Sequence, residues 1–294
     1  MDQPIDEFLS ELDYVYQHYE AFLASLPHSL QTLAMSDKRL SARGMNRVHL
    51  LFPFWFRDGL GVSLETCRSI ALGNACGLLH YIILDWIIDD DEGLGNEWLL
   101  LSELFYARAI QCYLSVIPSS ETLRWWTYLR EAMTQHAQGI LWEKGGYKVE
   151  DEFDDPGMAL MLRGAMFHIC GHTLALSSGC DEGSALVQAI NYFHAGFNIL
   201  DDIQDWQQDS QRRLHSNAGL QVTSSEQGGS LMWEHIDAAL EKSRTYLTEA
   251  KHCVEHLNAR YWNAFLDQYI GETHLLKNEL IQQIYQSVIV QREI

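Results

Sequence analysis

The sequence predicts an all-α fold, a single-domain helical bundle that spans residues 1–294. Hydrophobic residues make up 47% of the chain, which is ample for a packed core. Only five prolines occur in this length, which favours long uninterrupted helices over a turn-dense β architecture. No stretch shows a convincing strand pattern, and the sequence contains no internal repeat.

The first predicted helices follow from the spacing of apolar residues. Residues 4–25 carry apolar or aromatic side chains at every third or fourth position, and Pro27 follows their end. Residues 63–92 form a long candidate helix, in which Ser63 is placed to cap the N-terminus and Gly93 ends the helix. We expect the first helix to pack in the core and the second to run into an acidic segment.

The rest of the chain has the pattern of helices separated by turn residues. Residues 157–178 are apolar nearly all round, as in a central helix, and Gly171 within them predicts a kink or a close approach. Residues 216–230 are rich in Ser, Gly, Thr and Gln, which predicts a mobile loop. The other helices are expected over 97–116, 120–142, 182–209, 230–257 and 259–289.

The net charge of -20 argues against nucleic acid as a partner, because binding phosphates requires clustered Lys and Arg. It also opposes attraction to anionic lipid. The acidic N-terminus lacks the apolar core of a secretory signal, and charged residues and histidines break the most apolar windows. We therefore expect a cytoplasmic protein with no transmembrane segment, whose six scattered cysteines are buried free thiols.

Two acidic segments carry the strongest functional signal. Asp201, Asp205 and Asp209 recur at i, i+4 and i+8, so on a helix they line one face, with Asp202 beside them. Like charges at this spacing repel by roughly a few tenths of a kcal/mol per pair, which a bound cation would relieve. A matching acidic segment, residues 85–92, follows an earlier apolar run. We expect two helices that face each other across one metal-filled pocket.

The composition of these segments predicts the chemistry of their ligands. Clustered carboxylates without paired His or Cys suit Mg²⁺ or Mn²⁺, whose remaining ligands are water and substrate phosphate. A diphosphate held by several Mg²⁺ ions is a good leaving group. If its organic half is an allylic isoprenoid, departure leaves a carbocation, which an aromatic-lined apolar cavity would stabilise while excluding water. Aromatic residues on or near the expected pocket helices include Tyr81, Trp86 and Phe167.

These motifs resemble those of the class I isoprenoid synthases, the all-α superfamily of prenyl diphosphate synthases, squalene and phytoene synthases and terpene cyclases. Asp85-x-x-x-Asp89-Asp90-Asp91 is similar to the first aspartate-rich motif, in a register closer to squalene and phytoene synthases. Asp201-Asp202-x-x-Asp205 is similar to the second motif of prenyl diphosphate synthases, and with Asp209 it also fits the metal triad of terpene cyclases. The resemblance covers about residues 40–215 and implies a helical bundle with a central active-site cavity.

The resemblance also implies roles for individual residues and a cofactor of three Mg²⁺ ions, with Mn²⁺ as an alternative. The expected metal ligands are Asp85, Asp89, Asp90, Asp201, Asp202, Asp205 and Asp209. The expected catalytic residues are Asp85, Asp89 and Arg163, and the expected substrate-binding residues are Arg163, Arg212, Arg213, Trp86, Phe167 and Tyr81.

The three arginines also have structural interpretations. Arg163 is alone on a hydrophobic helix, where a guanidinium is costly to bury without an anion, so a core carboxylate is the alternative partner to diphosphate. Arg212 and Arg213 either close over the diphosphate when the following loop orders or lie exposed.

One departure from the pattern bears on the reaction. Chain-elongating members hold a second diphosphate with a Gly-Lys-x-x-Arg-type stretch and an Arg pair shortly after the first motif. Here the next basic residue after Asp91 is Arg108, and Arg43-Gly44-Met45-Asn46-Arg47 matches the upstream stretch only imperfectly. We therefore expect a Mg²⁺-dependent terpene synthase (cyclase) that ionises a prenyl diphosphate. The alternatives are a prenyl diphosphate synthase, a squalene- or phytoene-synthase-like prenyltransferase, or a non-catalytic partner subunit.

A pair of histidines leaves one different kind of site open. His168 and His172 share a helix face at i, i+4, as in a metal-binding helical bundle, although core or pocket-lining positions explain them more simply. The expected partner is a prenyl diphosphate substrate, and a homodimer follows the habit of the superfamily.

Overall fold

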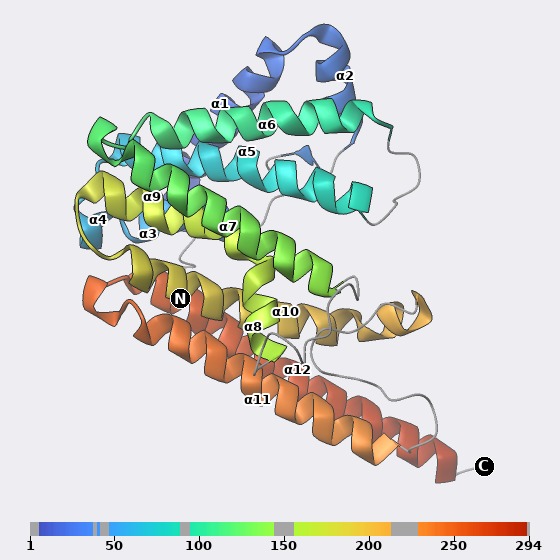
Figure 1. Ribbon diagram of the computed structural model, residues 1–294. Helices are drawn as coiled ribbons and strands as arrows, with labels where there is room; N and C mark the ends of the chain where they lie inside the picture. Colours follow the sequence, from blue (N-terminus) through green and yellow to red (C-terminus); the bar gives the residue numbers. More distant parts are fainter. Residues whose placement is uncertain are drawn as a thin grey trace. The chain divides into compact units, whose positions relative to one another are not determined.

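A computed structural model of the protein describes residues 6–37, 40–41, 47–88, 95–143, 156–212 and 229–292 (Figure 1). Within these ranges all the regular secondary structure is helical and no strand occurs, which confirms the all-α prediction. The helices are η1 Asp6–Phe8, α1 Leu9–Ser25, α2 His28–Ser36, α3 Arg47–Trp55, α4 Arg57–Leu60, α5 Leu64–Ile88, α6 Glu97–Leu114, η4 Ser119–Glu121, α7 Thr122–Glu143, α8 Pro156–Arg163, η6 Ala165–Phe167, α9 His168–Ser178, α10 Gly183–Arg212, α11 Gly229–His252, η7 Glu255–Leu257 and α12 Arg260–Arg292.

The chain forms two compact units, each assembled from separate stretches of sequence. The first unit comprises Met1–Tyr128, Ile169–Ser184 and Leu257–Tyr261. The second comprises Leu129–His168, Ala185–His256 and Trp262–Ile294. The expectation that residues 1–294 act as one domain stays a prediction.

In the first unit α5 packs against α1, α3 and α6, and Figure 1 shows α5 and α6 side by side. The predicted N-cap is confirmed, because Ser63 Oγ accepts a hydrogen bond from the Thr66 backbone N–H at 3.0 Å. Gly73 allows α6 to come close, since a Cβ there would lie 2.9 Å from the ring of Tyr113. The Tyr113 hydroxyl donates to Asn74 Oδ1 at 2.7 Å, which satisfies a buried amide between the two helices.

The apolar character of α5 is explained by this central position. Its length and composition would allow it to cross a membrane, and it is the one such helix among the described residues. However, 56% of its most apolar window is buried inside the protein. Those residues face α1, α3 and α6, so α5 has the features of a core helix.

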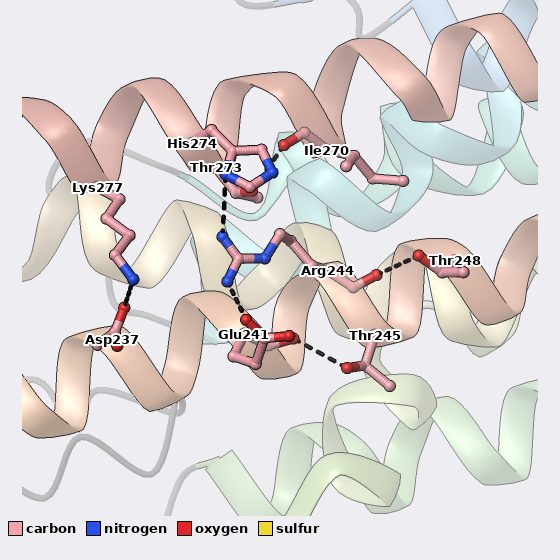
Figure 2. A network of polar contacts seen from close by, with 9 residues as sticks. All are labelled: Asp237, Glu241, Arg244, Thr245, Thr248, Ile270, Thr273, His274 and Lys277. Carbon is pink, nitrogen blue, oxygen red and sulfur yellow. Dashed lines mark hydrogen bonds and ion pairs between the residues drawn. The ribbon is translucent and has the colours of Figure 1, made fainter.

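The second unit holds α10 against α11 and α12. Ser243 Oγ of α11 donates to the Gly196 carbonyl oxygen of α10 at 2.8 Å, and Gly196 has no side chain to hold the helices apart. Arg244 of α11 bonds to His274 of α12 and also to Glu241 on its own helix (Figure 2). An aromatic cluster fills the space between α10 and α12: Phe193, Phe197, Trp262, Phe265 and Tyr269.

The segment predicted as one helix over 157–178 is interrupted, and not where its glycine pattern indicated. α8 ends at Arg163, the short η6 follows, and α9 then continues through Gly171 without a break. The interruption lies at Gly164, where a Cβ would stand only 2.3 Å from Cγ of His194. The helix therefore breaks at Gly164 and not at Gly171, and the alternative prediction for Gly171, a close approach, stays a prediction.

The other predicted helices agree with the structure to within a few residues. The helices α2, α3 and α4 were not predicted, because at nine residues or fewer each is too short to show a clear helical period. All six cysteines are free, as expected, although Cys180 and Cys253 are partly exposed. Residues 216–228 of the predicted loop lie outside the described ranges, and α11 begins at Gly229.

Candidate functional site

The acidic row of the second motif lies on a single helix, as its spacing predicts. α10 runs without interruption through Asp201, Asp205 and Asp209. The Asp201 side chain is exposed and Asp202 is half-buried. The side chains of Asp205, Asp209 and Arg212 lie outside the described part of the structure, and so does Arg213.

The apolar approach to this row anchors it in the second unit. Ile199 and Ile203 are 1% exposed, so one face of α10 is buried while Asp201 reaches solvent from another. Phe197, one turn before Asp201, packs against the ring of Tyr269 with centroids 5.8 Å apart. A rigid apolar face thus presents the carboxylates in a defined direction, which a binding site requires.

The negative charge of Asp201 affects the pKa of a neighbouring tyrosine. The pKa of Tyr269 is raised to about 12, chiefly by burial and to a smaller extent by the negative charges of Glu272 and Asp201. The same negative charge attracts cations, and carboxylate oxygens are the ligands that Mg²⁺ prefers. Asp201 and Asp202 therefore fit Mg²⁺, which takes one or two protein carboxylates and fills its shell with water and phosphate.

The first motif begins at the end of α5, in the first unit. Asp85 is exposed, whereas Asp89 and Asp90 lie outside the described residues. Tyr81 is half-buried one turn before Asp85, edge-on to His80 with centroids 4.8 Å apart, and burial raises the pKa of its phenol. Trp86 meets Trp98 of α6 edge to face at 6.4 Å. The last turns of α5 thus carry an exposed carboxylate beside aromatic side chains.

Arg163 is the last residue of α8, and its side chain is half-buried rather than enclosed. His136 Nδ1 of α7 donates to the Arg163 carbonyl oxygen at 2.9 Å. Asn198 Nδ2 of α10 donates to the Leu160 carbonyl oxygen at 3.3 Å. Both donors were missed by the sequence analysis. Asn198 could have been found, because it is a polar residue within the apolar stretch before Asp201. The sequence around His136 contains no comparable feature.

The histidine pair contacts protein groups that explain both side chains. His168 Nε2 donates to Asn191 Oδ1 at 2.5 Å, and burial lowers the pKa of His168 to about 4, so it is neutral at pH 7. The ring of His172 stacks on the ring of Tyr128, with centroids 3.7 Å apart. Across the described ranges no group of three or more His, Cys, Asp or Glu is arranged to hold a metal. Both histidines have the contacts of structural residues.

Phe167, which the sequence analysis placed at the substrate, lies in η6 and is 9% exposed. Its ring meets the imidazole of His194 edge to face, with centroids 6.1 Å apart. Phe167 is the last residue of η6, the short turn that follows the break at Gly164.

The all-α architecture matches the fold of solved isoprenyl diphosphate synthases. Three of the solved structures with this fold serve for comparison. A geranylgeranyl pyrophosphate synthetase from the archaeon Geoglobus acetivorans is 18% identical, with a TM-score of 0.71 over 89% of this chain and 98% of its own. A decaprenyl diphosphate synthase from Rhodobacter capsulatus is 13% identical, with a TM-score of 0.74 over 92% and 98%.

The third is a polyprenyl synthase from Caulobacter crescentus, complexed with calcium and isoprenyl diphosphate. It is 14% identical, with a TM-score of 0.67 over 92% of this chain and 97% of its own. A scan against protein-family models found no match, and a search of curated proteins found none.

These structures correct the expected reaction. Prenyl and polyprenyl synthases match the chain over nearly its whole length, so the prediction of a terpene cyclase is wrong and the alternative, a prenyl diphosphate synthase, is better supported. The cyclase prediction relied on basic residues that are missing after Asp91. Such residues act at one subsite through their side chains and do not determine the backbone fold. Their absence was therefore a poor basis for predicting the reaction.

Proposed function

We propose that the protein is a Mg²⁺-dependent prenyl diphosphate synthase, which joins an allylic prenyl diphosphate to isopentenyl diphosphate. The observation that carries the proposal is the match of nearly the whole chain to prenyl and polyprenyl synthases, combined with an exposed aspartate at each of the two motifs. In this reaction the allylic carbon–oxygen bond breaks, a carbon–carbon bond forms to isopentenyl diphosphate, and one proton is lost. Inorganic diphosphate is the second product.

We assign the metal ligands to the two aspartate motifs. The proposed ligands are Asp201, Asp202, Asp205 and Asp209 in the second motif, and Asp85, Asp89 and Asp90 in the first. Bound Mg²⁺ neutralises the charge on the departing diphosphate. The Caulobacter polyprenyl synthase structure is complexed with calcium and isoprenyl diphosphate, which supports a divalent metal here. Three Mg²⁺ ions, with Mn²⁺ as a substitute, remain our proposal.

The remaining residues orient the substrates. Arg163, Arg212 and Arg213 are the proposed ligands of the allylic diphosphate. Tyr81, Trp86 and Phe167 are the proposed contacts of the prenyl chain, where aromatic rings would exclude water and stabilise a carbocation. Arg47, exposed at the start of α3, is our candidate for the second diphosphate. A homodimer and a cytoplasmic location complete the proposal.

Metal removal tests this function. The purified protein is treated with EDTA, dialysed, and given geranyl diphosphate with isopentenyl diphosphate, and release of inorganic diphosphate is followed. We expect no release without metal, full recovery with Mg²⁺ and partial recovery with Mn²⁺. Equal release with and without divalent metal would contradict the proposal, because the aspartates would then have no role in the reaction.

A further inference from the structure

The C-terminal turn of α8, which carries Arg163, is held from α7 by two residues. The last carbonyl groups of a helix have no partner within the helix. His136 Nδ1 donates a hydrogen bond to one of these groups, the Arg163 carbonyl oxygen, at 2.9 Å. Gly139, almost one turn further along α7, leaves room for the same turn, because a Cβ there would lie 2.9 Å from the Arg163 backbone nitrogen. Close backbone packing thus keeps the donor and acceptor together.

The same turn is held from α10 on a second side. Asn198 Nδ2 donates to the Leu160 carbonyl oxygen at 3.3 Å, which satisfies a second carbonyl group near the end of α8. One turn earlier, the ring of His194 packs directly against Gly164. Asn198 precedes Asp201 by three residues, so the turn of α10 that leads into the aspartate row also fixes the turn that bears Arg163. All these residues belong to the second unit.

We propose that His136 and Asn198 are positioning residues for Arg163. Each bonds to the main chain of α8 rather than to a substrate, so each acts by fixing the backbone from which the guanidinium projects. This inference rests on the proposed function, in which Arg163 binds diphosphate. Misplacing a group in an active site by about 1 Å can slow a reaction about 100-fold. The loss of either bond should likewise displace the guanidinium and weaken diphosphate binding through Arg163.

The test measures binding of inorganic diphosphate with Mg²⁺ by isothermal titration calorimetry, and thermal unfolding checks the folding of each variant. The single variants are His136→Ala, Asn198→Ala and Arg163→Ala, and the double variant combines His136→Ala with Arg163→Ala. His136→Asn is the conservative variant, because its amide can donate to the same carbonyl oxygen. Thr134→Ala is the matched control, since Thr134 is exposed on α7 and bonds only locally to the Arg130 carbonyl oxygen.

We expect His136→Ala and Asn198→Ala each to weaken diphosphate binding about tenfold, by analogy with residues that orient metal ligands. His136→Asn should recover affinity to within about threefold, and Thr134→Ala should leave it unchanged. With Arg163→Ala already present, adding His136→Ala should change the affinity less than about twofold, because the group that it positions is gone.

Two results would overturn the inference while leaving the proposed function intact. In one, Arg163→Ala weakens binding but His136→Ala and Asn198→Ala do not. In the other, His136→Ala has the same effect with and without Arg163, as a general loss of structure would. If Arg163→Ala itself leaves diphosphate binding unchanged, the role of Arg163 in the proposed function fails, and the positioning role fails with it.

Discussion

The carboxylate of Asp201 on α10 raises the pKa of Tyr269 on α12. Together with burial, which is the larger cause, it brings this pKa to about 12. A negative charge disfavours the phenolate, so neutralising Asp201 lowers the Tyr269 pKa. We expect bound Mg²⁺ to lower it, as Asp201→Asn does, while burial keeps it above its ordinary value of 10.0. NMR titration of ¹³C-labelled tyrosine, with the signal assigned by Tyr269→Phe, measures the change. A Tyr269 pKa that responds to Asp201→Asn but not to Mg²⁺ would argue against a metal at Asp201.

Removing single carboxylates should affect turnover far more than stability. Asp201→Asn and Asp85→Asn are each expected to lower kcat/KM about 100-fold or more, which corresponds to about 2.7 kcal/mol of transition-state stabilisation. Both side chains are exposed, so the free energy of unfolding should change by less than about 0.5 kcal/mol. Asp181→Asn is the control, since Asp181 is also exposed and belongs to neither motif. Similar turnover in all three variants would show that the motifs are surface charges.

The break between α8 and α9 requires glycine at position 164. Gly164→Ala would place a Cβ 2.3 Å from Cγ of His194, and we expect a loss of about 2 kcal/mol or more in the free energy of unfolding. Gly271→Ala on α12 meets nothing within 4 Å and should instead add about 0.5–1 kcal/mol. Urea denaturation of both variants gives the comparison. Equal stability in the two would contradict the packing of α10 against Gly164.

His168 predicts a dependence of stability on pH. Its pKa is about 4 in the folded protein and ordinarily 6.5, so between these values the unfolded chain binds the proton more readily. The contribution of neutral His168 is therefore present above pH 6.5 and lost as the pH falls toward 4, up to about 3 kcal/mol. His168→Gln keeps an amide donor for Asn191 and does not titrate. Its unfolding free energy should fall less steeply from pH 7 to pH 4.5, and parallel curves would refute the prediction.

A structural element could be predicted where neighbouring residues in the sequence determine it. It could not be predicted where a residue of another helix does. The start of α5 was predictable, because Ser63 forms its cap with Thr66 within the same turn. The continuity of α10 through Asp201 and Asp209 was predictable from their spacing. The break at Gly164 was not, because it depends on His194 of another helix, and the apolar pattern of 157–178 continues through it.

The same distinction applies to the candidate site. The two aspartate motifs are visible in the sequence, because several carboxylates at helical spacing are costly without a ligand. His136 was not visible, because a single histidine on α7 acquires its role only from the Arg163 carbonyl oxygen beside it. The choice between cyclisation and elongation depends on side chains around the substrates, and missing basic residues after Asp91 pointed to the wrong reaction.

The most direct test of chain elongation is the incorporation of labelled isopentenyl diphosphate. The purified protein is incubated with Mg²⁺ and [¹⁴C]isopentenyl diphosphate, with or without geranyl, farnesyl or geranylgeranyl diphosphate, and the hydrolysed products are separated by chromatography. We predict label in prenyl alcohols at least five carbons longer than the allylic substrate, and none without that substrate. Hydrocarbon formation from an allylic diphosphate alone, with no label incorporated when isopentenyl diphosphate is added, would contradict the proposed function.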